Sequence, residues 1–280
     1  MNDKISINLP LFSFIDKGKS KIVEKGVNPN ILTIFCWNIN NPSYERACKQ
    51  VSWLCAQEAD IFILTECKQS KGCFLLKEYF QRYGYYVVFP KPEGNEYGVM
   101  IISKYPFEHS NFTNHINYLS SRLVSINLSF ANKLEIIGTY VPSRDSSYEK
   151  IERKNRFLKN LTDAFNENHS FHRRIFCGDF NILEPDHIPY YSFFKEWEYD
   201  FYRNLTKYQL KDAFRHLNPG IQEYSWVGRT GDGYRYDHCF VSIDILPLLQ
   251  KCYYLHEPRE QKLSDHSALI TTLKCNSKDH

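Results

Sequence analysis

Residues 173–182 have the sequence RRIFCGDFNI, and this stretch decides the predicted fold. A short apolar run bounded by arginines and a glycine is typical of a buried strand. Asp179 and Asn181 follow directly, where the end of a packed sheet can expose chemistry. Gly, Asp and Asn are also the common turn residues, so this segment alone favours an ordinary turn. The functional interpretation depends on the same pattern recurring along the chain.

Other apolar strands of the sequence also end in polar residues. Residues 31–37 run into Asn38 and Asn40, and residues 61–65 run into Glu66. The same kind of position is held by Tyr140, Asp179, Asn181, Asp237, Asp265 and His266. If these strand ends converge on one rim, they form a cluster of hard oxygen ligands with one imidazole. Mg²⁺ prefers such ligands, so the pattern favours a site for metal-assisted phosphodiester hydrolysis.

The composition sets limits on the class of protein. The 280 residues are 42% hydrophobic and 16% aromatic, which fits one large α/β domain or two smaller ones. A net charge of +3 permits a polyanionic partner without arguing for one. Nine cysteines, without a Cys-x-x-Cys pair, indicate free thiols in a reducing compartment rather than a disulfide framework or zinc site. No apolar run approaches the roughly 20 residues that span a bilayer, so we expect a cytoplasmic protein without membrane attachment.

Helices are expected between the strands. Ser43 can cap a helix whose apolar positions follow the 3.6-residue period, and residues 146–149 offer a capping box for a helix that ends near Asn168. The aromatic-rich residues 190–202 are also predicted to be helical. Because strands outnumber helices and the apolar runs are short, we expect an α/β protein with two packed sheets flanked by helices.

The domain organisation follows from a change of composition near residue 30. Residues 1–30 are mixed and lysine-rich and are interpreted as an N-terminal extension, with 31–275 as one catalytic domain. The extension is a candidate contact for a protein partner, although such charges are more often a solvated face.

Six motifs follow one another in a fixed order along the chain. They are Trp37-Asn38-Ile39-Asn40, Leu64-Thr65-Glu66, Tyr140-Val141-Pro142, Gly178-Asp179-Phe180-Asn181, Arg235-Tyr236-Asp237 and Ser264-Asp265-His266. Each motif alone is weak, but the ordered set is specific. It resembles the endonuclease/exonuclease/phosphatase superfamily, and within it exonuclease III and the apurinic/apyrimidinic endonucleases. This resemblance implies a four-layer αββα sandwich of the DNase I type, in which helices flank two mixed β-sheets.

The resemblance also implies roles for individual residues. The Mg²⁺ ligands, which we expect also to accept Mn²⁺, would be Glu66, Asn38, Asn40 and Asp265. The catalytic residues would be Asp179, which activates the attacking water, Asn181 beside it, Tyr140 at the scissile phosphate, and His266, which is oriented by Asp237. By the same resemblance, the aromatic residues Trp226, Tyr234 and Tyr236 would contact the substrate. The densest basic run of the chain, with Lys150, Arg153 and Lys154, is a candidate DNA-backbone contact together with Arg122, although such a run is more often a solvated helix face.

The implied activity is that of a Mg²⁺-dependent DNA nuclease, with cleavage at abasic sites as one option. RNA, lipid and protein-linked phosphodiesters are alternative substrates in the same superfamily. A catalytically silent binding platform is a further alternative, but its usual mark, replacement of the metal glutamate, the aspartate or the histidine, does not occur here. The sequence leaves open endonuclease or exonuclease action, the number of metal ions and the oligomeric state.

Overall fold

The computed structural model describes residues 30–128, 133–168 and 173–275. The strands of one sheet are β1 (Ile31–Asn38), β2 (Ile61–Cys67), β3 (Tyr86–Val88), β4 (Gly98–Ser103), β13 (Leu249–Leu255) and β14 (Ala268–Lys274). Those of the other are β5 (Phe107–His109), β6 (Leu123–Leu128), β7 (Leu134–Tyr140), β8 (Arg174–Asp179), β9 (Leu210–Asp212) and β12 (Asp237–Ser242). A separate short hairpin pairs β10 (Trp226–Val227) with β11 (Gly233–Tyr234).

The α-helices are α2 (Tyr44–Cys55), α3 (Lys71–Arg82), α4 (Tyr148–Glu167), α5 (Glu196–Asn204), α6 (Ala213–Leu217) and α7 (Glu257–Glu260). Shorter 3₁₀ turns are η2 (Asn111–His115), η3 (Ser120–Arg122), η4 (Leu205–Tyr208) and η5 (Ile243–Leu248). Ser43 caps α2 as predicted, because its Oγ accepts the Arg46 N–H at 3.3 Å. α4 also begins where predicted, but Ser147 makes no side-chain cap and instead donates its hydroxyl to Asp145 at 2.6 Å.

The two large sheets have the strand orders β13-β14-β1-β2-β4-β3 and β5-β6-β7-β8-β12-β9. β1 pairs with β2, and β7 with β8, in parallel, whereas the other pairs within these sheets are antiparallel. Both sheets are therefore mixed, as the resemblance implied.

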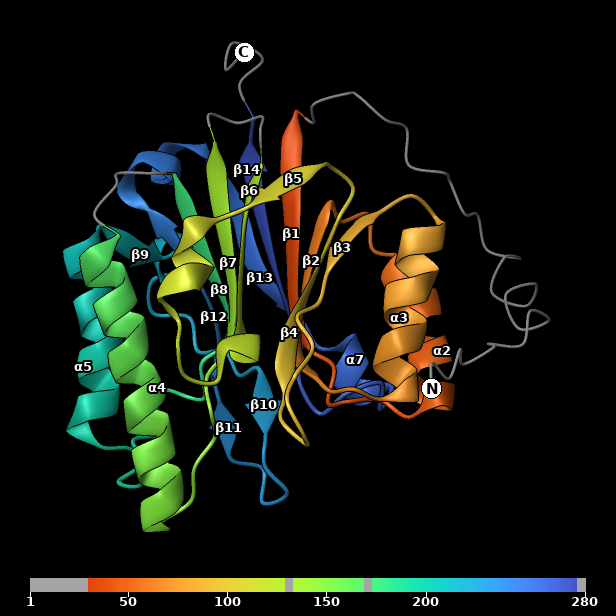
Figure 1. Cartoon of the computed structure of the whole chain (residues 1–280). Coiled ribbons are helices and arrows are strands. Elements are labelled where there is room, and N and C mark those ends of the chain that lie inside the picture. The colour runs from red at the N-terminus through yellow and green to blue at the C-terminus, as the bar shows by residue number, and fades with distance from the viewer. Residues whose placement is uncertain (1–29, 129–132, 169–172, 276–280) are drawn as a thin grey trace.

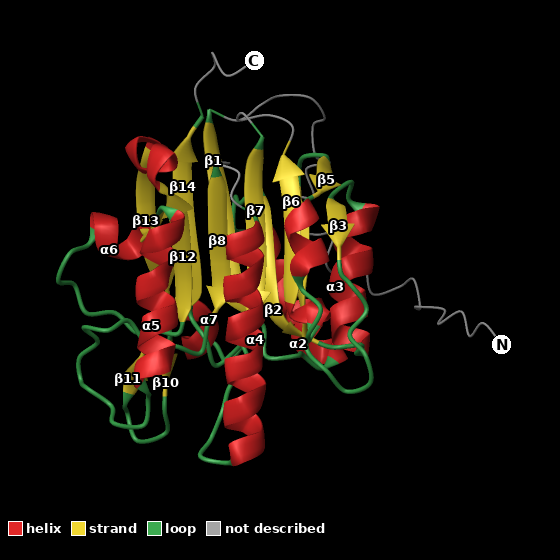
Figure 2. Ribbon diagram, turned by 60° about the vertical axis from the view of Figure 1, so that its left-hand side comes forward, coloured by secondary structure: helices red, strands yellow, loops and turns green. Residues whose placement is uncertain are grey.

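The sheets pack face to face around an apolar core built from β1, β2 and β4 on one side and β6, β7, β8 and β12 on the other. The outer face of the first sheet is covered by α2 and α3, and that of the second by α4 and α5 (Figures 1 and 2). Burial of apolar surface on both faces of each sheet is the main force that holds the layers together. The order helix, sheet, sheet, helix confirms the predicted four-layer sandwich.

The prediction for residues 190–202 was wrong in part. The helix α5 begins only at Glu196, after Lys195, whose backbone N–H donates to Glu198 at 3.0 Å. Residues 190–195 form a turn and irregular chain instead, in which the Phe194 N–H donates to the Tyr191 carbonyl at 3.3 Å.

Two further expectations concern the chain ends and the membrane. The partner contact expected in residues 1–30 lies outside the described residues, apart from Asn30 itself. Among the helices that the structure describes, none has the length and apolarity required to cross a bilayer.

The parallel pairs bring the carboxyl ends of β1, β2, β7 and β8 to one edge of the sandwich, the lower edge in Figures 1 and 2. β12 starts at this edge, so that Asp237 lies opposite Asp179 on β8, and Tyr140 ends β7 on the other side of Asp179. Gly178 permits this close pairing, because a Cβ there would lie 1.9 Å from the Thr139 carbonyl oxygen. Gly178 is thus required by packing, and Asp179, which follows it, lies at the rim.

Candidate active site

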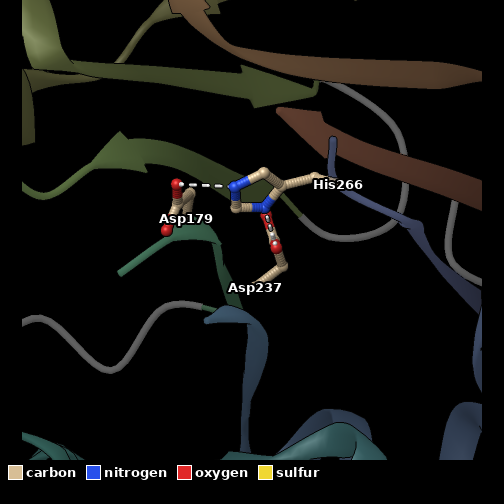
Figure 3. Close-up of side chains that lie close together, drawn as sticks. All are labelled: Asp179, Asp237 and His266. Carbon is tan, nitrogen blue, oxygen red and sulfur yellow. Dashed lines mark hydrogen bonds and ion pairs between the residues drawn. The ribbon is translucent and has the colours of Figure 1, made fainter. Parts of the chain in front are cut away.

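His266 lies between two buried carboxylates at the rim of the sandwich (Figure 3). Its Nδ1 is 2.7 Å from Asp237 Oδ2, and its Nε2 is 4.0 Å from Asp179 Oδ2. The loop before β14 carries His266, and a backbone bridge to Trp226 holds this loop against the β10–β11 hairpin. The three side chains therefore come from different parts of the chain and meet only in the folded protein.

The electrostatics of this cluster favour a protonated histidine. Burial alone would lower the pKa of His266, but the Asp237 carboxylate outweighs burial and raises it to about 10. Burial raises the pKa of Asp179 to about 7; the negative charge of Asp237 adds to the rise, and His266 opposes it. Near neutral pH the site thus combines an imidazolium cation with a carboxyl group that can gain or lose a proton.

Asn38 connects this cluster to the end of β1. Its Nδ2 donates to Asp179 Oδ2 at 2.9 Å and lies 3.5 Å from His266 Nε2. Its Oδ1 accepts the backbone N–H of Asn40 at 2.9 Å. The other oxygen of Asp179, Oδ1, accepts the Asn181 N–H at 2.9 Å. Both oxygens of Asp179 are therefore held in place by amide donors.

Glu66 and Tyr140 form a second part of the rim. Glu66 has a positive φ of 55°, at an irregularity between Leu64 and Cys67 where β2 and β4 lose their regular register. The Tyr140 hydroxyl donates to Glu66 Oε1 at 2.6 Å. Burial raises the pKa of Tyr140 well above its usual value, and the Glu66 carboxylate acts in the same direction, so the phenol stays a donor.

Asp265 and Asn40 form the outer part of the rim. Asn40 Nδ2 donates to Asp265 Oδ1 at 2.9 Å, and Trp226 Nε1 donates to Asp265 Oδ2 at 3.1 Å. Tyr234 and Tyr236 stack on one another with ring centroids 5.2 Å apart, and both contact Trp226. The structure thus brings all three predicted aromatic residues together beside the polar cluster.

The predicted basic contacts divide into two groups. Lys150 and Arg153 are partly exposed on α4, where they pair with Asp145 and Glu96. Arg122 and Lys154 are buried, and this differs from the expectation of a DNA-backbone contact. Arg122 Nη2 contacts Glu96 at 2.6 Å and its Nη1 donates to the Tyr140 carbonyl at 3.2 Å. The internal partners of Lys154 are likewise carboxylate and carbonyl oxygens, so neither cation presents a free charge to a polyanion.

Two serines that support the site were given no role by the sequence analysis. Ser264 Oγ donates to the Asn38 carbonyl at 2.6 Å and accepts the His266 N–H at 3.3 Å. Ser225 Oγ accepts the backbone N–H of Asp237 at 3.1 Å. Ser225 directly precedes Trp226, and Ser264 directly precedes Asp265. This position next to a predicted site residue is the sequence feature that could have indicated their role.

The donor set at the rim suits a hard divalent ion. Asp179, Asp237 and His266 place one potential ligand atom each within 4.8 Å of the others. The imidazolium form of His266, which the Asp237 carboxylate favours, has no lone pair for a metal. Glu66, Asn38, Asn40 and Asp265 offer only carboxylate and amide oxygens, the ligand type of Mg²⁺ and Mn²⁺.

Comparisons with known proteins agree with this architecture. Residues 35–266 match the model of the Endonuclease/Exonuclease/phosphatase family. An AP endonuclease from Archaeoglobus fulgidus has a similar structure, with a TM-score of 0.72 and 24% identity over 86% of this chain and 99% of its own. A 3′-5′ exonuclease from Neisseria meningitidis is also similar, with a TM-score of 0.73 and 23% identity over 87% of this chain and 100% of its own. A 3′ phosphatase from Neisseria bound to a product DNA hairpin has a TM-score of 0.71 and 23% identity over 86% of this chain and 98% of its own. At these identities the structures show a shared fold, and no curated protein matches the chain.

Proposed function

This chain belongs to the Endonuclease/Exonuclease/phosphatase family, whose members hydrolyse phosphoester bonds, and we propose that it is a Mg²⁺-dependent nuclease that cleaves DNA. The observation that carries the proposal is the imidazolium of His266, fixed by Asp237 and facing Asp179 across 4.0 Å at the joint edge of two sheets. The solved relatives that share the fold include an AP endonuclease and a 3′-5′ exonuclease. Residues 31–275 would form the catalytic domain.

Asp179 is assigned to the attacking water. Its carboxylate is oriented by the Asn38 and Asn181 amides at 2.9 Å, and its pKa of about 7 is close to the value at which a general base works best near neutral pH. It would hold the water and accept a proton from it, while Asn181 occupies the adjacent position on the same loop.

His266 is assigned to the phosphate oxygens. With a pKa of about 10 it is cationic at neutral pH and would stabilise negative charge that develops on the phosphate during in-line attack. Asp237 fixes the ring so that Nε2 points into the site. The Tyr140 hydroxyl, a neutral donor beside Glu66, would contact the scissile phosphate or the leaving oxygen.

The metal ion would be held mainly by Glu66, with Asn38, Asn40 and Asp265 completing the oxygen shell around it. When bound, Mg²⁺ supplies positive charge that neutralises the phosphate oxygens. The rest of the substrate would contact the aromatic group of Trp226, Tyr234 and Tyr236, and its backbone would contact Lys150 and Arg153.

Labelled duplexes test the proposal, one intact and one carrying a single abasic site, each incubated with Mg²⁺ or with EDTA. We expect Mg²⁺-dependent cleavage that is lost in Asp179→Ala and His266→Ala but kept in His109→Ala, whose histidine is exposed on β5. Cleavage at the abasic site alone would identify a repair-type endonuclease, and equal degradation of both duplexes a general nuclease. If neither duplex is cut, DNA is the wrong substrate; RNA, lipid and protein-linked phosphodiesters then come next, and inactivity on all of them would indicate a silent platform.

A further inference from the structure

Lys154 lies on α4, but its ammonium group points into the protein. The side chain is 1% exposed and donates to the backbone carbonyl of Asn181 at 2.6 Å and to Glu198 Oε1 at 2.5 Å. Transfer of a charged amine from water into a protein costs free energy unless it is paired and hydrogen-bonded. Two short hydrogen bonds meet that requirement, and one of them ends directly on the loop that carries the predicted catalytic groups.

Glu198 links Lys154 to a second buried cation. Arg144 donates to Glu198 Oε2 through Nε at 3.1 Å and also through Nη2. Arg144 Nη2 additionally donates to the Phe193 carbonyl at 2.7 Å. The side chains of Arg144 and Glu198 are 2% and 0% exposed. Two cations therefore share one carboxylate, and this Lys154–Glu198–Arg144 cluster carries a net positive charge behind the site.

Asn181 is the residue that this cluster holds in place. Its φ of 49° is in the left-handed region, which asparagine tolerates better than most residues. Its N–H donates to Asp179 Oδ1 at 2.9 Å, and its Nδ2 donates to the Val141 carbonyl at 3.0 Å. The carbonyl of the same residue accepts from Lys154. These three bonds fix Asn181 through its side chain and through both peptide groups that flank it, and the Asn181 N–H in turn fixes the Asp179 carboxylate.

We propose that Lys154 is a positioning residue for the reaction: from behind the site it fixes the Asn181 peptide, and through Asn181 it orients the Asp179 carboxylate. Glu198 and Arg144 hold the Lys154 ammonium in place. This inference rests on the proposed function, because it assigns a role within the same site. It replaces the expectation that Lys154 contacts DNA.

A purely apolar packing role does not explain this arrangement. A buried ion pair is often no more stabilising than apolar side chains of similar volume, so stability alone does not favour a lysine here. An ammonium group can instead donate several hydrogen bonds in different directions, to Asn181 and Glu198 at once. Burial lowers the pKa of Lys154 to about 8, against the opposing effect of Glu198, so the ammonium form is retained at neutral pH.

The test compares two variants. Lys154→Met keeps the length of the side chain and loses its charge, whereas Glu198→Gln removes the negative charge that pairs with the Lys154 ammonium. The matched control is Lys211→Met, since Lys211 is exposed on β9. At a temperature well below each Tm, we expect Lys154→Met to lower kcat about 10- to 100-fold with KM within about twofold of wild type. Glu198→Gln should cause a smaller loss in kcat, and Lys211→Met none.

A second measurement needs no substrate. Hydrogen exchange of the peptide that spans Gly178 to Leu183 should be faster in Lys154→Met and Glu198→Gln than in wild type and Lys211→Met. If both variants lower Tm while kcat and this exchange rate stay unchanged, the cluster has only a structural role and the proposal is wrong. If Lys154→Met does not fold, Glu198→Gln decides by the same two criteria. An inactive wild-type protein would overturn the proposed nuclease function, whereas unchanged exchange would overturn the positioning role.

Discussion

The Tyr140 hydroxyl donates to Glu66 Oε1 at 2.6 Å, and this bond joins the two sheets at the active-site edge. Tyr140 ends β7 in one sheet, and Glu66 lies near the end of β2 in the other. The Arg122 guanidinium lies 4.5 Å from the centroid of the Tyr140 ring and helps to fix the ring. The position of the Glu66 carboxylate therefore depends on the way the sheets pack together.

Tyr140→Phe should remove this bond while it leaves the ring packing intact. We expect the free energy of unfolding to fall by only about 1 kcal/mol, the usual contribution of one hydrogen bond. With Glu66 free to rotate, the Mg²⁺ concentration for half-maximal activity should rise severalfold, and kcat should fall about tenfold. Titration of activity against Mg²⁺ measures both effects. Tyr208→Phe is the control, because its hydroxyl bonds Asn166 outside the site, and an unchanged Mg²⁺ requirement in Tyr140→Phe would contradict the role given to Glu66.

Asp237→Asn should change the pH dependence of stability. Burial lowers the pKa of His266, but the carboxylates around it, Asp237 above all, raise it from 6.5 to about 10. Protonation of His266 therefore stabilises the fold fully below pH 6.5, and this contribution is lost as pH rises through about 10. Without the Asp237 carboxylate most of this contribution disappears. In EDTA, the free energy of unfolding should therefore be lower in the variant by about 2 kcal/mol near pH 6, and the difference should shrink toward pH 10.

Urea unfolding at a series of pH values measures this difference. The control is Asp200→Asn, since Asp200 is an exposed partner of Arg203 and its loss should have no comparable pH dependence. A difference between Asp237→Asn and wild type that stays constant from pH 6 to pH 10 would show that Asp237 does not control the protonation of His266.

The strands that carry the site could be predicted from the sequence because each of them is a local pattern, an apolar run followed by a polar residue. The apolar runs that lead into Glu66 and Asp179 could be identified without tertiary information, and the structure places both residues at one edge. The strand β13 was missed. Within β13, an edge strand, the buried residues are Leu249, Cys252 and Tyr254, and exposed residues separate them, so β13 lacks the continuous apolar run by which the buried strands were identified.

The role of Lys154 could not be predicted from sequence for a different reason. Lys154 lies in the densest basic run of the chain, and the usual location of such residues is a solvated helix face. Its burial depends on Glu198 and Asn181, which are distant in sequence and reach it only when α5 and β8 pack against α4. Periodicity along α4 places position 154 on the inward face, but it does not show that the Glu198 carboxylate lies beside that position.

Gly178→Ala should destabilise the fold strongly. A Cβ at this position would lie 1.9 Å from the Thr139 carbonyl oxygen, so β7 and β8 would have to separate beside Asp179. We expect a loss of about 3 kcal/mol or more in the free energy of unfolding, measured by urea denaturation. Gly228→Ala is the matched control, since its nearest neighbour would be the Trp226 ring at 3.4 Å. Equal stability of the two variants would contradict the close approach of β7 and β8.

Lys150→Ala tests whether the exposed part of α4 contacts DNA. α4 extends past the lower edge of the sheets in Figures 1 and 2, toward the side that carries the active site. The Lys150 side chain is 56% exposed, and its ammonium group pairs with the similarly exposed Asp145 at 2.8 Å, an ion pair that stabilises little and can exchange for a phosphate. We expect weaker DNA binding in the variant and a slope of log K against log salt that is smaller by about 1, because one fewer counterion is released. Lys251→Ala on β13 removes the same charge at the far sheet edge and should leave this slope unchanged. If Lys150→Ala and Lys251→Ala show the same slope, α4 does not contact the DNA backbone at Lys150, and net charge alone governs the salt dependence.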